Sequence, residues 1–500
     1  MEGTARPAPA QYAGVRSHTT QPRPRTQPSV WRAARHRRRR GRRLHDPRKG
    51  PAKGTFGLGF RLRRVIWSWW LWAALAIWML ATDHWWWATG FGVAAILSHL
   101  VYPRSESPRF GLDHEFSVDS AEFLTTMAGA TGVPYIAGNT FEILNNGDAF
   151  YPRMLADIRA ARHSITMEAY IYWAGEIGAE FAAALAERAK AGVRVVILLD
   201  AVGSSDIGDD TIRILEDGGC HVDWYNPLHW KTLGRFNNRT HRKSLIVDGE
   251  IAYTGGAGIA DHWKGNARGP EEWRDIQIRF EGPAVIALQT GFAHNWQQTT
   301  GEVVTGDAFY PVVEPRGPHA LQVILSSPEL GGSSVQTMYY LAIACARKSI
   351  YIANPYFVPD AVAVEMLREA KRRGVDVRVM VSGLRNDNWL ARRNSVRLFG
   401  RLLEMDIPIL EYNRSMMHHK VMVVDSRWVT IGSTNFDARS FAHNEESNVC
   451  LYEPGVARDM ERVFHEDARI CEPVSLQAWR RRGVVERAGE VVAFMLEDQV

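Results

Sequence analysis

The feature that most constrains this chain is a motif that occurs twice, 177 residues apart. His241-Arg242-Lys243 and His418-His419-Lys420 are each followed by four mostly apolar residues and then by an aspartate, Asp248 or Asp425. Apolar, largely β-branched runs of this kind predict buried strands. Because residues two apart on a strand share a face, each histidine is expected to point the same way as the lysine of its motif.

The duplication extends beyond this motif. Ala161–Ile165 matches Ala346–Ile350, and Lys190–Val195 matches Arg372–Val377, with separations of 185 and 182 residues. In each copy a helical pattern ends at glycine, the usual cap residue, and a β-branched strand follows. The sequence therefore predicts two copies of one β-α-β-α-β unit, either as separate domains or packed face to face.

An imidazole beside a fixed ammonium group suits phosphodiester chemistry. The lysine neutralises phosphoryl oxygens, while the histidine attacks phosphorus or moves a proton. Each half has one such histidine, so a two-step reaction requires the halves to meet at one centre. The sequence has no acidic cluster typical of a Mg²⁺ or Zn²⁺ site, and the adjacent histidines His418 and His419 should point to opposite faces. We expect no metal and no other cofactor.

These residues resemble the phospholipase D superfamily, whose signature is His-x-Lys-x4-Asp with a downstream Gly-Ser-x-Asn. The second copy continues with Gly432-Ser433-Thr434-Asn435 and Asn444-Glu445-Glu446, and the first with Trp273-Arg274-Asp275, as in the bacterial cardiolipin synthase branch. The resemblance covers about residues 120–480. It departs at Gly258, where the family usually has asparagine, so the two half-sites are expected to be unequal.

The resemblance implies an α/β fold of two tandem phospholipase-D-like α-β-α domains, related by a pseudo-twofold axis. It implies transfer of a phosphatidyl group through a phosphohistidine, with His241 as the expected nucleophile and the other histidine as the proton donor. The catalytic residues that it implies are His241, Lys243, Asp248, His418, Lys420 and Asp425. The supporting residues are Asn435, Ser433, Asp275 and Glu446.

Within that set, the roles differ. Both lysines and Asn435 are expected to hold phosphoryl oxygens. Asp275 and Glu446 are expected to orient the imidazoles by accepting their far N–H groups. Asp248 and Asp425 lie at strand ends, and we expect them to be structural and only indirectly catalytic. Aromatic residues at matching strand ends, near Tyr170 and Tyr356, suit either a substrate pocket or core packing.

The segment before these repeats predicts a membrane attachment. Val65–Thr82 and Trp85–Val101 are apolar stretches long enough for two transmembrane helices, separated by Asp83-His84. Basic residues flank both outer ends, so the catalytic part is expected on the cytoplasmic side of a bacterial inner membrane. One span followed by a re-entrant segment is the alternative, because Gly90, Gly92 and His99 weaken the second stretch.

Charge is divided unevenly along the chain. Residues 1–64 carry 18 Lys and Arg against two Asp and Glu, whereas the remainder carries 42 against 53. A net acidic body is a poor non-specific binder of nucleic acid. The charge therefore argues against nucleic acid as a partner. The partners that the resemblance and the apolar segment imply are phosphatidylglycerol and other anionic phospholipids in a membrane. The run Arg35–Arg43 suits anionic lipid, although nucleic acid or a solvated tail stays open.

Five regions are predicted along the chain: a disordered Arg-rich arm (1–60), two transmembrane helices (61–104), two phospholipase-D-like domains (105–310 and 311–475), and a basic amphipathic C-terminal segment (476–500). That last segment suits either a membrane surface or an ordinary surface helix.

The leading function that the resemblance implies is synthesis of cardiolipin from two phosphatidylglycerols. A hydrolytic phospholipase D, a phosphodiesterase or endonuclease, and an inactive membrane scaffold remain as alternatives.

Overall fold

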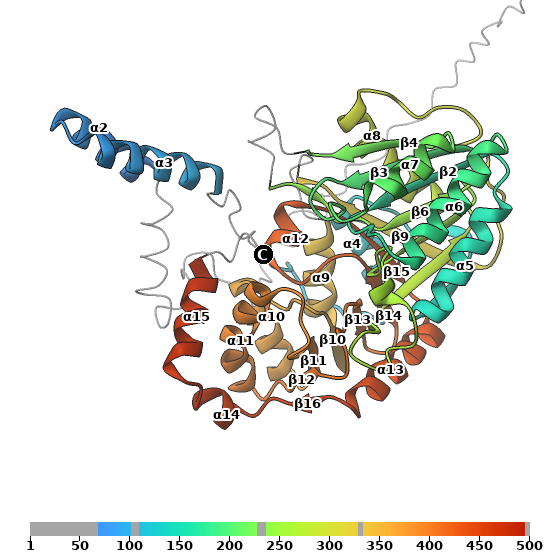
Figure 1. Ribbon diagram of the computed structural model, residues 1–500. Coiled ribbons are helices and arrows are strands. Elements are labelled where there is room, and N and C mark those ends of the chain that lie inside the picture. The colour runs from blue at the N-terminus through green and yellow to red at the C-terminus, as the bar shows by residue number, and fades with distance from the viewer. Residues whose placement is uncertain (1–68, 102–109, 228–236, 329–333, 496–500) are drawn as a thin grey trace, which may run out of the picture. The chain divides into compact units, whose positions relative to one another are not determined.

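The computed structural model describes residues 69–101, 110–227, 237–328 and 334–495 (Figure 1). The predicted disordered arm with its Arg35–Arg43 run, and the first four residues of the predicted span, lie outside the described residues.

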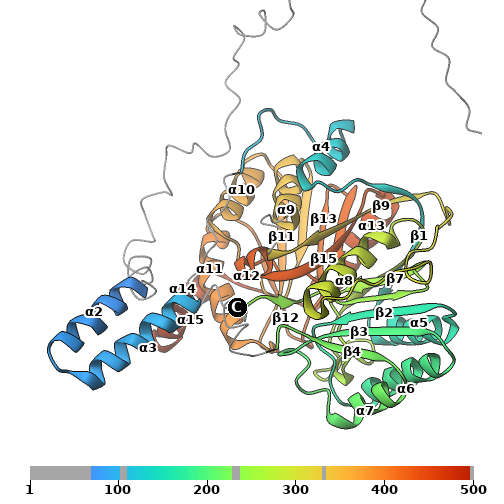
Figure 2. The same cartoon turned by 90° about the horizontal axis from the view of Figure 1, so that it is seen from above.

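The strands join into one hydrogen-bonded path that has two halves (Figures 1 and 2). Strands of the first half are β1 (Ile136–Asn145), β2 (Ser164–Ala169), β3 (Arg194–Asp200), β4 (His221–Tyr225), β5 (Arg239–Thr240), β6 (Ser244–Val247), β7 (Ile251–Gly255) and β8 (Ile276–Glu281). Strands of the second half are β9 (His319–Ser326), β10 (Ser349–Ala353), β11 (Asp376–Ser382), β12 (Ile409–Tyr412), β13 (Lys420–Val424), β14 (Trp428–Gly432), β15 (Asn444–Leu451) and β16 (Glu472–Pro473).

The strand order is palindromic about the β9–β1 junction. It reads β16-β12-β11-β10-β13-β14-β15-β9-β1-β8-β7-β6-β2-β3-β4, so each strand from β1 outward has a counterpart from β9 outward. The junction itself is antiparallel, with Ile136 opposite Leu321 and Asn139 opposite His319. A two-fold relation between the halves produces this order.

Each half contains the predicted β-α-β-α-β unit, which is confirmed. In the first half, α6 (Glu176–Lys190) and α7 (Asp209–Asp217) connect the parallel strands β2, β3 and β4. In the second half, α10 (Ala361–Arg372) and α11 (Trp389–Leu403) connect β10, β11 and β12. Antiparallel strands β6–β8 and β13–β15 then complete the two halves.

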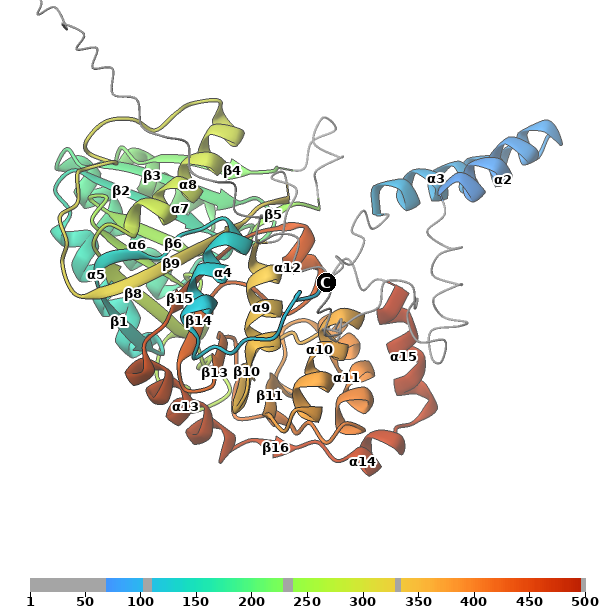
Figure 3. The same ribbon diagram turned by 180° about the vertical axis from the view of Figure 1, so that it is seen from behind.

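Three large hydrophobic clusters hold these layers together. One packs α5 (Gly147–Ala160), α6 and α7 against the first half, and another packs α4 (Ala121–Thr131), α9 (Ser334–Cys345), α10 and α11 against the second. The third contains α8 (Val285–Thr300), α13 (Pro454–Ala468) and strands of both halves (Figure 3). The halves therefore share a core, and separate domains are excluded. The remaining helices are η3 (Asp261–Trp263), α12 (Ala438–Ala442), α14 (Leu476–Arg480) and α15 (Val484–Met495).

The apolar N-terminal segment forms two adjacent helices, α2 (Trp69–Ala81) and α3 (Trp85–Val101), separated at the predicted Asp83-His84 turn. They have 13 and 17 residues, or about 20 and 26 Å of helix, against about 30 Å of bilayer hydrocarbon. In the part of the chain that the structure describes, no helix combines the length and hydropathy of a membrane span. The described helices therefore do not confirm the prediction of two transmembrane spans.

Candidate active site

Both motif histidines lie just before their strands rather than inside them. β6 begins at Ser244 and β13 at Lys420, so the prediction that His241 and His418 are strand residues is wrong. The reason is a contact between the halves. The His241 N–H donates to the Glu445 carbonyl at 2.9 Å, and the His418 N–H donates to the Arg274 carbonyl at 2.8 Å. Each histidine is thus held by main chain of the opposite half.

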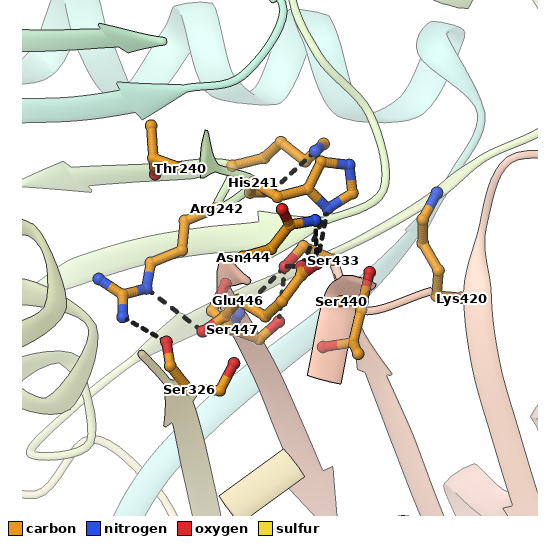
Figure 4. A network of polar contacts seen from close by, with 12 residues as sticks. Thr240, His241, Arg242, Ser326, Lys420, Ser433, Ser440, Asn444, Glu446 and Ser447 are labelled. Atoms are coloured by element: carbon orange, nitrogen blue, oxygen red, sulfur yellow. Dashed lines mark hydrogen bonds and ion pairs between the residues drawn. The ribbon is translucent and has the colours of Figure 1, made fainter. Parts of the chain in front are cut away.

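The carboxylates that bind the imidazoles also come from the opposite half. Nδ1 of His241 lies 3.0 Å from both carboxylate oxygens of Glu446 (Figure 4). Nδ1 of His418 lies 3.0 Å from Asp275 Oδ2. All four side chains are buried. Because a carboxylate held this way orients the ring through Nδ1, it leaves Nε2 as the nitrogen that can react.

The two carboxylates are supported differently. The Ser433 hydroxyl donates to Glu446 at 2.5 Å, whereas the Trp263 indole N–H donates to Asp275 at 2.8 Å. Gly256 is the counterpart of Ser433, and a Cβ there would lie 2.3 Å from an Asp275 oxygen. A serine therefore cannot fit in the first half, and an indole supplies the hydrogen bond instead.

Both motif lysines turn back toward their histidines. Lys243 Nζ donates to the His241 carbonyl at 2.8 Å. Lys420 Nζ lies 3.1 Å from both ring nitrogens of His418 and donates to its carbonyl. Both ammonium groups are buried. Burial, followed by the charge of Lys420, lowers the pKa of Lys243 to about 7, and burial lowers the pKa of Lys420 to about 8.

The two histidine–carboxylate pairs differ electrostatically. Burial raises the pKa of Glu446 to about 7, although Lys243 opposes this. Burial also acts to raise the pKa of Asp275, but the His418 hydrogen bond and Lys420 outweigh it and hold the pKa below its ordinary value. Burial and the neighbouring lysines hold the pKa of His241 well below 6.5. Burial and Lys420 also lower the pKa of His418, although Asp275 opposes them.

Residue 258 explains the inequality of the half-sites. At Gly258 a Cβ would lie 2.8 Å from the Ile171 carbonyl oxygen and 2.9 Å from its Cβ, so this half has no room for an asparagine. The corresponding Asn435 is buried in the second half, and its Oδ1 has no hydrogen-bond partner among the described residues. Of the two equivalent positions, 258 and 435, the second alone therefore supplies a carboxamide.

The two motif aspartates bind the main chain. Asp248 accepts hydrogen bonds from the N–H groups of residues 162, 163 and 164, at 2.7 to 3.1 Å. Asp425 accepts the equivalent three from residues 347, 348 and 349, at 2.7 to 2.9 Å. Both adopt positive φ, 53° and 54°. Each aspartate ties the end of its motif strand to the start of the neighbouring strand, β2 or β10.

Aromatic side chains flank both imidazoles. The Tyr170 ring centroid lies 5.0 Å from that of His241, edge to face, and Tyr356 lies 6.3 Å from His418 in the same geometry. The Tyr356 hydroxyl donates to Asp387. No sequence motif marks Asp387, but its position shortly after the carboxyl end of the parallel strand β11 is typical of ligand sites in α/β sheets.

Arg242 and Glu445 join the halves behind His241. The Arg242 guanidinium lies 2.5 Å from Glu445 and donates to the carbonyls of Gly291, Ser326 and Glu446 (Figure 4). The ion pair is almost fully buried. Glu168 of β2 is also buried nearby and accepts hydrogen bonds from Thr240 and Asn295.

Comparison with known proteins supports these assignments of fold and family. Residues 154–263 and 340–468 match the family described as cardiolipin synthase, PLD-like domain. Cardiolipin synthase 1 of Bacillus anthracis is 32% identical over 366 residues, 71% of this chain and 72% of the relative. The major cardiolipin synthase ClsA of Bacillus subtilis is 29% identical over 408 residues, 81% of this chain and 84% of the relative.

A solved structure has a similar fold. The phosphatidylserine synthase of Haemophilus influenzae aligns with a TM-score of 0.57 over 76% of this chain and 100% of its own, at 12% identity. At that identity the likeness concerns the fold alone. The paired motifs, the palindromic sheet and the sequence relatives agree, and the chain belongs to the cardiolipin synthase branch of the phospholipase D superfamily.

Proposed function

We propose that the protein is a membrane-bound phosphatidyltransferase that makes cardiolipin and glycerol from two molecules of phosphatidylglycerol. The observation that carries the chemistry is the proximity of two buried histidine–lysine pairs. The charges of Lys420 and His418 act on His241, and each histidine is bonded to a carboxylate of the opposite half. The lipid specificity comes from the cardiolipin synthase relatives.

In the first step, Nε2 of His241 attacks the phosphorus of one phosphatidylglycerol. A phosphorus–nitrogen bond forms and the bond to the departing glycerol oxygen breaks, while His418 gives that oxygen a proton. The assignment follows the electrostatic difference between the pairs. The pKa of His241 lies well below 6.5, so its ring is neutral and nucleophilic. The pKa of His418 is lowered too, but Asp275 opposes that lowering, because its own pKa is held low and an ionised carboxylate stabilises an imidazolium.

In the second step, the neutral His418 accepts a proton from the free hydroxyl of the second phosphatidylglycerol. That oxygen attacks phosphorus, the phosphorus–nitrogen bond breaks, and His241 regains its lone pair. Lys243, Lys420 and Asn435 hold the non-bridging oxygens, on which charge increases in both transition states. The two lysines are costly to keep charged in the buried site, so an anionic phosphodiester binds more tightly there than a neutral lipid.

Asp248 and Asp425 act through the chain rather than on the substrate. Their bonds to three main-chain N–H groups fix the end of each motif strand, and the strand in turn positions its lysine and histidine. We assign them as positioning residues. Ser433 is also a positioning residue, because its hydroxyl donates a hydrogen bond to Glu446.

We further propose that the apolar segment containing α2 and α3 attaches the enzyme to the bacterial inner membrane, with the sheet-bearing body on the cytoplasmic side. The support is the apolar sequence of both helices and the basic residues at the two outer ends of the pair. Deletion of residues 61–104 should move the protein from the alkali-resistant membrane fraction to the soluble fraction.

The test of the function is mass spectrometry of lipids from a cardiolipin-null bacterium that expresses the chain. Cardiolipin should appear with the native sequence and with His163→Ala, a control at an exposed histidine, but not with His241→Ala or His418→Ala. Accumulation of phosphatidic acid instead of cardiolipin would identify a hydrolase that uses water as acceptor. Unchanged lipids would contradict the lipid substrate and favour the endonuclease or scaffold alternatives.

A further inference from the structure

The C-terminal helix α15 presents an apolar face outward. Val484 and Val485 are 84% and 85% exposed, and Val491 and Val492 are each 51% exposed. With about 100° per residue, these four positions and Ala488 fall within an arc of about 120°. Such a continuous apolar stripe is unfavourable in water and marks a surface that binds something.

The opposite face of α15 fixes the helix in this orientation. Glu490 is 5% exposed and its carboxylate lies 3.1 Å from Arg482 Nε. Asn394 of α11 donates to the Ala493 carbonyl at 3.0 Å, and the Arg397 guanidinium lies 4.5 Å from the Phe494 ring centroid. Helix α15 lies beside α11 (Figure 3), with Glu490 and Phe494 buried and its valines exposed.

A basic groove lies beside this apolar face. It has a volume of about 410 Å³ and is lined by Arg397, Trp479, Arg480, Arg482, Arg487, Glu490 and Val491. Helix α11 carries four arginines and no acidic residue, and residues 476–495 carry four arginines against two glutamates. The rest of the body is net acidic, so positive charge is concentrated where the exposed valines are.

The same surface continues toward the active site. Leu384 and Trp389 are 83% and 55% exposed, and Trp389 begins α11, whose contacts with α15 were described above. Between them lies Asp387, the acceptor for the Tyr356 hydroxyl, and the Tyr356 ring flanks His418. A segment with exposed apolar side chains therefore joins the basic helix pair to the edge of the site.

We propose that α15, the basic groove and residues 384–389 form a docking surface for a bilayer that contains anionic phospholipid. The valines, Leu384 and Trp389 enter the interface, and the groove arginines bind lipid phosphates. A second copy of the chain fits less well, because two such surfaces would bring their arginines together. The docked surface delivers phosphatidylglycerol from the membrane plane to the site without passage through water.

The test places an environment-sensitive fluorophore on full-length protein in a Cys471→Ser background, since the other cysteines are buried. The label is attached at Val485→Cys, with Glu187→Cys on α6 as a control at an exposed position of the first half. The protein is reconstituted in vesicles of phosphatidylcholine with or without phosphatidylglycerol, and some vesicles carry lipids with a quencher in their acyl chains.

The label at residue 485 should be blue-shifted and quenched in phosphatidylglycerol vesicles, while the label at 187 should not. Val484→Glu should remove most of the quenching, whereas Val312→Glu, at a valine 92% exposed elsewhere, should leave it unchanged. Arg480→Gln and Arg487→Gln, at two arginines that line the groove, should each lower the ratio of docked to undocked protein about fivefold.

Two results would overturn the proposal. A label at 485 that stays in water shows that the face does not meet the bilayer. A label that is blue-shifted without lipid, and not quenched by lipid-borne quencher, shows that protein covers the face, either another segment of this chain or a second copy. Quenching reports insertion and not turnover, so the enzymatic proposal can fail without affecting this test.

Discussion

Replacement of Lys243 by methionine should stabilise the fold while it abolishes activity. The Lys243 ammonium is buried, its charge is close to that of Lys420, and it donates a hydrogen bond to the His241 carbonyl. Methionine has a similar length and no charge, so it can fill the same space. The charge is therefore present for phosphate binding at the expense of stability.

The magnitude follows from the pKa. A decrease from 10.5 to about 7 corresponds to a penalty of about 5 kcal/mol on the charged form, and about 4 kcal/mol of this is felt at pH 7. Loss of the hydrogen bond to the His241 carbonyl costs about 1–3 kcal/mol. We expect a net gain of about 2 kcal/mol in the free energy of unfolding, or roughly 2–3 °C in Tm.

The assay is thermal unfolding followed by tryptophan fluorescence, with Lys190→Met as the control at an exposed lysine. The unfolded chain keeps the Lys243 proton up to about pH 10.5, whereas the folded chain loses it near pH 7. The unfolded state therefore binds more protons in this window, so the stability of the native protein should rise with pH and the advantage of the variant should shrink. A variant that is less stable at pH 7, or an advantage that does not change from pH 7 to 10, would refute the reasoning.

Three further predictions concern the reaction. With a phosphatidyl ester of p-nitrophenol, whose leaving group needs no proton, His418→Ala should release a burst of one equivalent of nitrophenol and His241→Ala none; the reverse result would exchange their roles. Asp275→Asn should lower kcat by about 10²- to 10⁴-fold. Glu446→Gln should lower it less near neutral pH, because a group with a pKa of about 7 is already partly protonated there, and equal losses would contradict the electrostatic difference. The value of kcat/KM should fall as pH rises through about 7 to 8, where the free enzyme loses the protons of Lys243 and Lys420, and kcat should fall only at higher pH because a bound phosphodiester raises both pKa values.

Much of the fold was predictable because the duplication is visible in the sequence. The spacing of Ala161–Ile165 and Ala346–Ile350 located equivalent strands, and glycine-terminated helices indicated parallel connections. The family resemblance also pointed to Asp275 and Glu446, whose carboxylates lie 3.0 Å from the imidazoles. The positions of His241 and His418 outside their strands were not predictable, because they depend on hydrogen bonds to main chain about 200 and 144 residues away.

Other features required three-dimensional packing. Trp263 substitutes for a serine hydroxyl only because a Cβ at Gly256 would collide with Asp275, and no local pattern reports such a collision. The buried pair Arg242 and Glu445 belongs to different halves, so neither residue has a sequence neighbour that reveals its partner. The valine face of α15 points outward because the helix contacts α11 with its other side. The apolar periodicity of the sequence alone is equally typical of a helix whose valine face is buried.

The exchange of carboxylates between the halves has a consequence for how such a chain can change. A substitution at Glu446 is felt by the histidine of the first repeat, and one at Asp275 by the histidine of the second. Selection therefore cannot improve one repeat in isolation, and a chimaera that combines repeats from two relatives would pair each histidine with a foreign carboxylate. If the backbone were cut in the segment between α8 and β9, each fragment would carry an imidazole whose orienting acid lies on the other fragment, so activity would become a readout of reassembly.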